Sequence, residues 1–312
     1  MKKGMLILIG FSCVVNAVNF PHEQEKRGVK RHIDEIMPQG PTIHEQLVQA
    51  VLQRDVETVE RLLDETGINI NRRYAPHGDT LHMIAANEGN VEMVNALRAR
   101  GADINIQNNM GNTALHHVLV NDDYVLLIHL LQVPHRQLNI VNQNGTTPLL
   151  AGILNDSVHT VNILLNHHLI THELDINRAN NDGESPLVLA IFNADLTLLN
   201  RLLQVGAIVP TNSAFGTPLK LAIITENPAL VNRILQVPGI DVNFQDEEGE
   251  SALMAAAVGG NIEIVRLLLA KDALVKLKDT QGRTAIEYAQ NSASDTKNVI
   301  IKILEKQKRL ES

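Results

Sequence analysis

The feature that most constrains this sequence is a glycine that returns at nearly constant spacing. The members of the series are Gly78, Gly111, Gly145, Gly183, Gly216, Gly249 and Gly282. Successive members are 33, 34, 38, 33, 33 and 33 residues apart. A period of this length is typical of repeat proteins, in which each unit packs mainly against its neighbours. We therefore expect a stack of similar units rather than one compact core.

The sequence within one period predicts two short helices joined by a tight reversal. A hydroxyl residue followed by proline, as in Thr147-Pro148 and Ser185-Pro186, is typical of a helix start. The hydroxyl accepts a bond from a free backbone amide, and proline has no amide that needs a partner. Residues 259–261, Gly-Gly-Asn, then end the first helix of the Gly249 unit, because glycine and asparagine tolerate the left-handed conformation. Residues 262–269 place apolar side chains on one face of a second helix.

These motifs resemble the ankyrin repeat over residues 43–310. The closest matches to the family pattern are Gly101-Ala102-Asp103-Ile104-Asn105, Thr147-Pro148-Leu149, Thr217-Pro218-Leu219 and the whole Gly249 unit. A divergent first unit begins at His44 and lacks the opening turn. The resemblance implies an all-α ankyrin-repeat solenoid of helical hairpins with projecting finger loops, containing about seven to eight repeats including the caps.

Three departures from the family pattern predict local differences. His82 stands where the pattern has a core leucine, so its repeat is expected to be less stable. The Gly145 unit spans 38 residues against 33 for most others, and its surplus falls at residues 166–177, which predicts an extended finger or helix end. The last unit loses its Ala-Ala pair and ends in the polar stretch KQKRLES, which suits a terminal cap.

The first 42 residues lack the repeat pattern and predict a signal peptide followed by a linker. Lys2 and Lys3 precede an apolar run over residues 4–15 and the small-residue pattern Val15-Asn16-Ala17, which is typical of a signal peptide at residues 1–17. We expect an exported protein, periplasmic or secreted, without stable membrane insertion after cleavage; a membrane anchor and an N-terminal core helix are the alternatives. Cleavage would remove Cys13, the only cysteine. Residues 18–42 are polar and rich in proline, so we expect a linker or a poorly ordered lead-in.

Charge and motifs narrow the function. A net charge of −8 and a pI near 5.9 argue against a nucleic-acid partner, which would favour a basic face. Nucleophile elbows, phosphate-binding glycine loops and His-Glu-x-x-His helices do not occur in the sequence, so we expect no enzyme activity and no cofactor. One alternative stays open, a metal or enzymatic site formed by His167, His168 and His172 with Glu173, since His168 and His172 are four residues apart.

The resemblance also implies where a partner protein would bind. Family members contact partners through residues that flank the turn glycine in each finger and through exposed positions at the end of the first helix. The finger positions here are Asn109, Met110, Asn112, Gln143, Asn144, Thr146, Asn181, Asp182, Glu184, Glu247, Glu248 and Glu250. The helix-end positions are Val120 with Asn121, Leu154 with Asn155, Phe192 with Asn193, Ile224 with Thr225, and Val258 with Gly259.

Five of these helix-end residues form what we name the apolar row: Val120, Leu154, Phe192, Ile224 and Val258. The sequence allows two interpretations, an exposed docking surface on the concave face or side chains rotated into the core. Acidic residues near the later fingers, Asp246 included, would attract a basic partner or serve only solubility. The resulting hypothesis is a monomeric, non-enzymatic protein-interaction module. It would be a secreted host-interacting protein or a periplasmic scaffold.

Overall fold

The computed structural model describes residues 41–209 and 217–310. The predicted signal peptide lies outside the described residues, as does nearly all of the predicted lead-in. The described chain is helical, and its β structure consists of two isolated bridges, Tyr74 with Asp79 and Gln245 with Ser251. The described residues form two compact units, one that ends at residue 166 and one that begins at residue 167.

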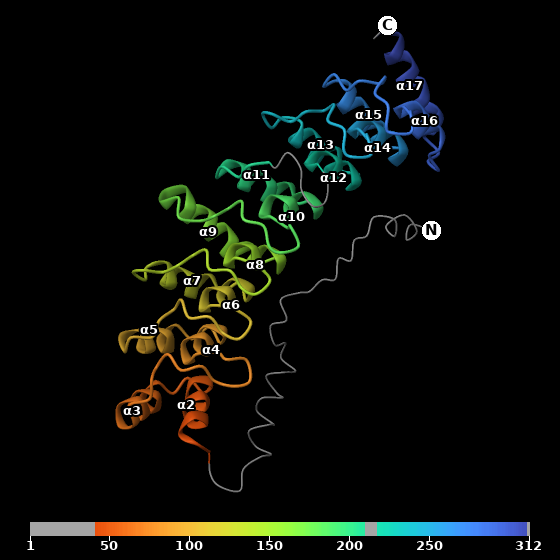
Figure 1. Cartoon of the computed structure of the whole chain (residues 1–312). Helices are drawn as coiled ribbons and strands as arrows, with labels where there is room; N and C mark the ends of the chain where they lie inside the picture. The colour runs from red at the N-terminus through yellow and green to blue at the C-terminus, as the bar shows by residue number, and fades with distance from the viewer. Residues whose placement is uncertain (1–40, 210–216, 311–312) are drawn as a thin grey trace. The chain divides into compact units, whose positions relative to one another are not determined.

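Unit 1 consists of helical hairpins that follow one another along the chain (Figure 1). Its helices are α2 (Ile43–Leu52), α3 (Val56–Thr66), α4 (Leu81–Asn87), α5 (Val91–Ala99), α6 (Ala114–Val120), α7 (Tyr124–Leu131), α8 (Pro148–Leu154) and the first part of α9 (Val158–Thr171). We call the first helix of each hairpin inner and the second outer. Inner helices pack on inner helices, as in α4 on α6, and outer helices pack on outer helices, as in α5 on α7.

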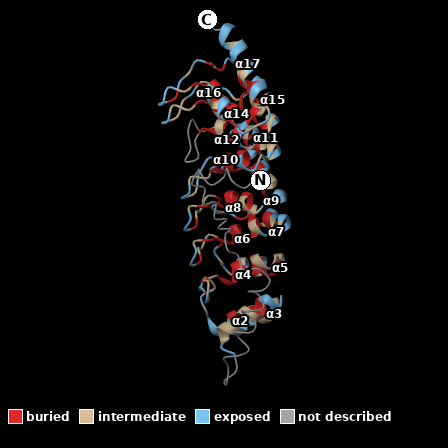
Figure 2. Cartoon of the chain, turned by 90° about the vertical axis from the view of Figure 1, so that its right-hand side faces the viewer, coloured by how far each residue is buried: buried red, intermediate tan, exposed pale blue. Residues whose placement is uncertain are grey.

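Unit 2 repeats the same arrangement. Its helices are the end of α9, α10 (Pro186–Phe192), α11 (Leu196–Gln204), α12 (Pro218–Ile224), α13 (Pro228–Ile234), α14 (Ala252–Gly259), α15 (Ile262–Leu269), α16 (Ala285–Gln290) and α17 (Lys297–Leu310). The repeat architecture predicted from the glycine spacing is confirmed. Figure 2 shows buried residues gathered on the inner helices, and exposed residues on the outer helices and at the finger tips.

The predicted helix starts form as expected. The Thr147 hydroxyl accepts a bond from the amide of Leu150 at 3.2 Å, and the Ser185 hydroxyl accepts one from Val188 at 3.3 Å. Pro148 and Pro186 occupy the first turn and are buried. Each hydroxyl thus satisfies an amide that the helix leaves without a carbonyl.

The reversal between the two helices of a hairpin needs one left-handed residue, not three special ones. In the Gly249 unit that residue is Gly260, with φ +82°, while Gly259 still belongs to α14. Asn261 does not take part as a left-handed residue; its side chain caps α15 by accepting a bond from the Ile264 amide at 3.1 Å. Other hairpins place Asp122 or Ala194 at the same point with φ 53° and 54°. The reversal is therefore set by the hairpin and the cap, and glycine only makes it less strained.

The surplus of the Gly145 unit is a helix end. α9 runs for 14 residues, whereas the outer helices α5 and α7 have 9 and 8. Of the two alternatives predicted for residues 166–177, an extended finger or an extended helix end, the extended helix end is confirmed. His82 also lies where the sequence placed it, in the core, with an exposed fraction of 1 %.

Candidate partner-binding surface

The apolar row is accessible to solvent at its three members in unit 2. Phe192 is 38 % exposed and Ile224 is 51 % exposed, and Val258 is half-buried. The residues just before Phe192 and Ile224 are buried: Ile191 is 0 % exposed and Ile223 is 5 % exposed. One step along a helix turns a side chain by about 100°, so the last residue of the inner helix points away from the core that its neighbour fills. The interpretation in which the row rotates into the core is therefore wrong for Phe192 and Ile224.

The members of the apolar row in unit 1 are less exposed to solvent than Phe192 and Ile224. Val120 and Leu154 are both half-buried, and neither belongs to the core. Leu52 ends α2 in the equivalent position and is 40 % exposed. Sequence reasoning missed Leu52 because the first repeat lacks the turn glycine on which the units were aligned. Alignment on the ends of the inner helices would have found it.

The residues that directly follow the apolar row differ in whether their side chains form hydrogen bonds within the protein. The Asn121 side chain donates to the Asn87 carbonyl at 3.0 Å and so ties two neighbouring repeats together. The Asn155 side chain donates to the Ala151 carbonyl of its own helix at 2.8 Å. Asn193 is exposed at the end of α10, and Gly259 is exposed at the end of α14. Thr225, at the end of α12, is half-buried. Asn121 and Asn155 therefore have a structural role in addition to any contact with a partner.

Five of the described fingers are tight turns, each built around one Asn or Asp side chain. The Asn142 carboxamide oxygen accepts bonds from the amides of Asn144 and Thr146, both at 3.0 Å. Asn108, Asn180, Asp246 and Asp279 accept from their own turns in the same way. In these five fingers the acceptor lies three residues before the turn glycine, a signal that is present in the sequence, whereas Ala75 holds that position in the Gly78 unit. The turn fixes which finger residues face the solvent.

The two sides of the turn glycine have different roles. Residues before the glycine are exposed: Asn109, Met110, Gln143, Asn144, Asn181, Asp182, Glu247 and Glu248. Residues after it return to the repeat, and Asn112 and Thr146 are each 1 % exposed. The prediction that Asn112 and Thr146 would be available to a partner is therefore wrong, since the Asn112 carboxamide accepts a bond from Asn142 at 3.0 Å inside the stack. Glu184 is half-buried and accepts from Asn180 at 2.8 Å.

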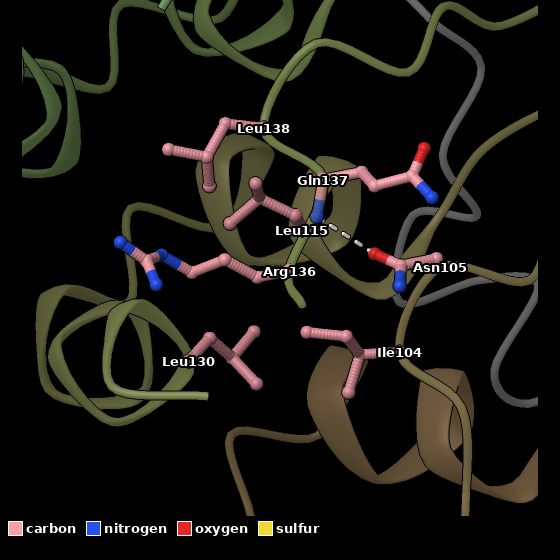
Figure 3. Close-up of a pocket in the computed structure, with 7 residues that line it drawn as sticks. All are labelled: Ile104, Asn105, Leu115, Leu130, Arg136, Gln137 and Leu138. Carbon is pink, nitrogen blue, oxygen red and sulfur yellow. Dashed lines mark hydrogen bonds between the residues drawn. The ribbon is translucent and has the colours of Figure 1, made fainter. Parts of the chain in front are cut away.

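Neighbouring fingers also bind each other, which holds the tips in place. The Gln143 amide donates to the Met110 carbonyl at 3.0 Å, and the Thr280 amide donates to the Glu248 carbonyl at 2.9 Å. At the base of the fingers, the Asn105 side chain accepts from the Gln137 amide at 2.9 Å beside a small cavity of about 10 Å³ (Figure 3). That cavity has room for about one water molecule and is no ligand site.

Part of the acidic charge near the later fingers is used inside the protein. Lys220 occupies the helix position that holds His116 in an earlier repeat, and its ammonium group forms ion pairs with Asp246 and Glu250 of the next finger. The lysine side chain is only 14 % exposed. Burial lowers its pKa, but the two carboxylates outweigh burial, so the pKa of Lys220 is raised overall. Glu247, Glu248 and Asp182 keep exposed charges.

The motif histidine His116 has a structural role. Its Nδ1 accepts a bond from the Thr113 amide at 3.1 Å, so Nε2 carries the proton and donates to the Thr146 carbonyl of the next repeat at 3.1 Å. Burial lowers the pKa of His116 to about 4, and the nearby His117 adds to this. The neutral ring links two repeats and is not available for catalysis.

The histidines around residue 170 do not assemble a metal site. His167 and His168 lie in α9 rather than in a loop, and the Nδ1 atom of His168 accepts a bond from the Leu174 amide at 3.1 Å. This bond ends the helix, and burial lowers the pKa of His168 with help from His172 and His167. Among the residues that the structure describes, no group of three metal-ligating side chains comes together. In the same residues, no helix combines the length and apolar character needed to cross a bilayer.

Comparison with known proteins agrees with this architecture. The family model for ankyrin repeats, in three copies, matches residues 47–131, 117–213 and 219–310. Among solved structures, the chain is similar to the ankyrin repeat domain of Bcl-3, a unique member of the IκB protein family. The two share 24 % sequence identity with a TM-score of 0.51, and the match covers 85 % of this chain and 99 % of that one. At this identity the likeness concerns the fold alone.

Proposed function

Since the chain belongs to the ankyrin repeat family, whose repeats are generally protein–protein interaction modules, we propose that it is a non-enzymatic protein that holds a partner protein. The contact would lie at the ends of the inner helices and at the finger tips. The observation that carries this proposal is the exposure of Phe192 and Ile224, at 38 % and 51 %, beside core residues of the same helices. Exposed apolar side chains at defined positions favour a binding surface over a solvated face.

The exposed finger residues of each unit would add polar contacts beside the inner-helix ends of that unit. In unit 1 they are uncharged amides and a methionine: Asn109, Met110, Gln143 and Asn144. In unit 2 the tips carry the carboxylates of Asp182, Glu247 and Glu248. Because these fingers are braced by inter-repeat bonds, a partner would meet side chains whose backbone is already ordered, which lowers the entropy cost of binding.

The location of the protein is part of the proposal. An exported protein, periplasmic or secreted, is supported by the sequence pattern of residues 1–17 alone. Two roles follow, a secreted protein that binds host proteins or a periplasmic scaffold. Sequencing the N-terminus of the protein recovered outside the cytoplasm tests this: a chain that begins after residue 17 supports export, and an uncleaved chain retained in the cytoplasm contradicts it.

A capture experiment with three matched versions of the full chain tests the binding surface. The first is unchanged, the second carries Phe192→Asp and Ile224→Asp, and the third carries Ile170→Asp at an apolar residue that is 82 % exposed outside the row. Circular dichroism first establishes that all three are equally folded. Proteins bound by the first and third and lost by the second are then purified and titrated directly against all three.

The expected result is tight binding by the unchanged chain and by the Ile170→Asp chain, with a loss of affinity in the row variant. Loss of a central apolar contact costs about 2 kcal/mol or more at an interface, which is a factor of at least about 30 in affinity. A partner that binds all three chains equally well would exclude the row, and the same titration with Glu247→Lys and Glu248→Lys would then examine the fingers.

A further inference from the structure

The histidines of this protein are confined to one end of the chain. All 13 lie before residue 173, so the helices from α10 to α17 contain none. His82, His116 and His117 are buried in α4 and α6, two inner helices that pack on each other. We call helices α4 to α7 the histidine hairpins. Since histidine is the side chain whose charge changes between pH 5 and 8, mild acid acts differently on the histidine hairpins and on α10 to α17.

His116 cannot take up a proton without losing a hydrogen bond. Its Nδ1 atom already accepts from the Thr113 amide at 3.1 Å, and its Nε2 atom donates to the Thr146 carbonyl at 3.1 Å. A second proton would have to bind Nδ1, which would then be a donor that faces another donor. The neighbouring His117 disfavours a positive charge on the ring as well. The titratable residues on the helices packed against α6 are His82 in α4 and Tyr124 and His129 in α7, and none of these is a carboxylate.

His82 is buried without a hydrogen bond. Neither of its ring nitrogens has a partner among the described residues, and the residue is 1 % exposed. Arg98 of α5 disfavours a proton on the ring, and Asp103 favours one. A protonated ring at this place would be a buried charge without a hydrogen-bonded partner, which the folded chain relieves only by opening. The titratable residues on the other helices packed against α4 are His44 and Glu45 in α2 and His116 and His117 in α6.

The two remaining buried histidines have different surroundings. Nε2 of His117 lies 3.6 Å from the carboxylate of Asp79, so a proton on this ring gains an ion pair inside the stack. The same carboxylate accepts a bond from the Asn108 side chain at 2.7 Å. His168 lies near the end of α9, where its Nδ1 atom accepts from the Leu174 amide, outside the inner helices. We therefore count His82 and His116 alone as groups that oppose folding in acid.

The helices of unit 2 depend on groups that titrate at lower pH. Lys220 pairs with Asp246 and Glu250, and Arg283 pairs with Asp279. Burial raises the pKa of Asp279, but hydrogen bonds from the amide and side chain of Arg283 outweigh burial and lower the pKa to about 2. The Asp279 carboxylate thus stays charged in the range where His82 and His116 become protonated in an unfolded chain.

We propose that mild acid opens the histidine hairpins while helices α10 to α17 stay folded, which makes one end of the repeat array a pH-sensitive element. Repeat arrays permit such partial opening, because each repeat packs only on its neighbours and long arrays need not unfold as one. The stability that the neutral rings confer is fully present above pH 6.5 and is lost as the pH falls towards 4. The pKa of both rings is lowered to about 4 in the folded chain, so each should shift the opening equilibrium about 30-fold between pH 7.5 and pH 5.0. Together they should shift it about 900-fold.

Hydrogen exchange of the full chain at pH 7.5 and pH 5.0, read by mass spectrometry, tests this proposal. Exchange rates are converted to protection factors, which removes the pH dependence of the chemical exchange step. Amides in the histidine hairpins are expected to lose protection by up to about 900-fold at pH 5.0, while those of α10 to α17 keep theirs. Equal loss in both sets of helices would overturn the proposal, and so would full protection of the histidine hairpins at pH 5.0.

Two variants show whether the buried rings are the cause. His82→Leu together with His116→Leu is expected to remove the loss of protection, and Leu150 holds the position of His116 in the next repeat. The ratio of protection at the two pH values is compared within each variant, so a change in overall stability cancels. His135→Asn removes an exposed histidine with φ 59°, a conformation that asparagine tolerates, and should behave as the unchanged chain. A loss of protection that survives in the double variant would assign the opening to other groups and refute the proposal.

Discussion

Replacing His82 by leucine should stabilise the protein and remove part of its sensitivity to acid. His82 lies in the core of the second repeat, 1 % exposed, where neither ring nitrogen finds a hydrogen-bond partner among the described residues. A buried polar group without a partner costs about 1–3 kcal/mol. His82→Leu fills the same space with the residue type that the repeat pattern favours, so we expect a gain in unfolding free energy of about 1–3 kcal/mol at pH 7.5.

The pH dependence follows from the same burial. Burial lowers the pKa of His82 from 6.5 to about 4, with a further contribution from the charge of Arg98. The unfolded chain therefore binds a proton below pH 6.5 that the folded chain does not bind until about pH 4. Stability is fully present above pH 6.5 and is lost as the pH falls through this window. At pH 5 the loss from this one group is about 2 kcal/mol.

Urea unfolding at pH 7.5 and pH 5.0 measures both effects. The difference in unfolding free energy between the two pH values should shrink by about 2 kcal/mol in His82→Leu, although His116 still contributes, because its pKa is also about 4. Met83→Leu alters the same helix at a core residue without changing a titratable group, and its pH difference should equal that of the unchanged chain. An unaltered pH difference in His82→Leu would refute the reasoning.

Three further changes test how the repeats hold together. Ala194→Gly relieves a left-handed alanine with φ 54° and should raise the unfolding free energy by about 1 kcal/mol, as a urea midpoint measures; a lower midpoint would show that the turn is unstrained. Lys220→Met leaves Asp246 and Glu250 facing each other without their cation and should lower the melting temperature, by the equivalent of about 3 kcal/mol; an unchanged melting temperature would contradict a structural role for the ion pairs. Asn105→Ala removes the bonds to Gln137 and to the His135 carbonyl and should cost about 2 kcal/mol, with faster amide exchange at Gln137; protection equal to that of the unchanged chain would argue against this link.

The helices were predictable because their signals are local. Thr147-Pro148 specifies a helix start through one hydroxyl and one ring, and these act within a single turn of chain. The position of His82 was predictable for a related reason, since the register of a repeat fixes which residue faces the core. Because the same unit occurs several times, the copies can be aligned with one another, and the alignment fixes the register of each.

The contacts between repeats were harder to predict. Nothing within one unit indicates that Lys220 pairs with Asp246 and Glu250, because the partners lie in the next finger. The sequence therefore left those carboxylates as candidates for steering a partner. The burial of Asn112 and Thr146 was missed for the same reason: the fold turns the residue after each glycine inward, where it bonds to its own turn or to the neighbouring repeat.

Stability and recognition are separated in this protein by single steps along a helix. Ile223 and Ile224 are chemically identical neighbours, yet one is 5 % exposed and the other 51 %. The stacking of repeats needs the first, and it leaves the second free to vary. The same separation holds in α7, where Leu126 and Leu127 are fully buried between exposed Val125 and Ile128. Because the stack fixes only the inward positions, the apolar residues retained at outward positions are those that stability alone does not explain. The surface proposed on the inner-helix ends rests on that distinction.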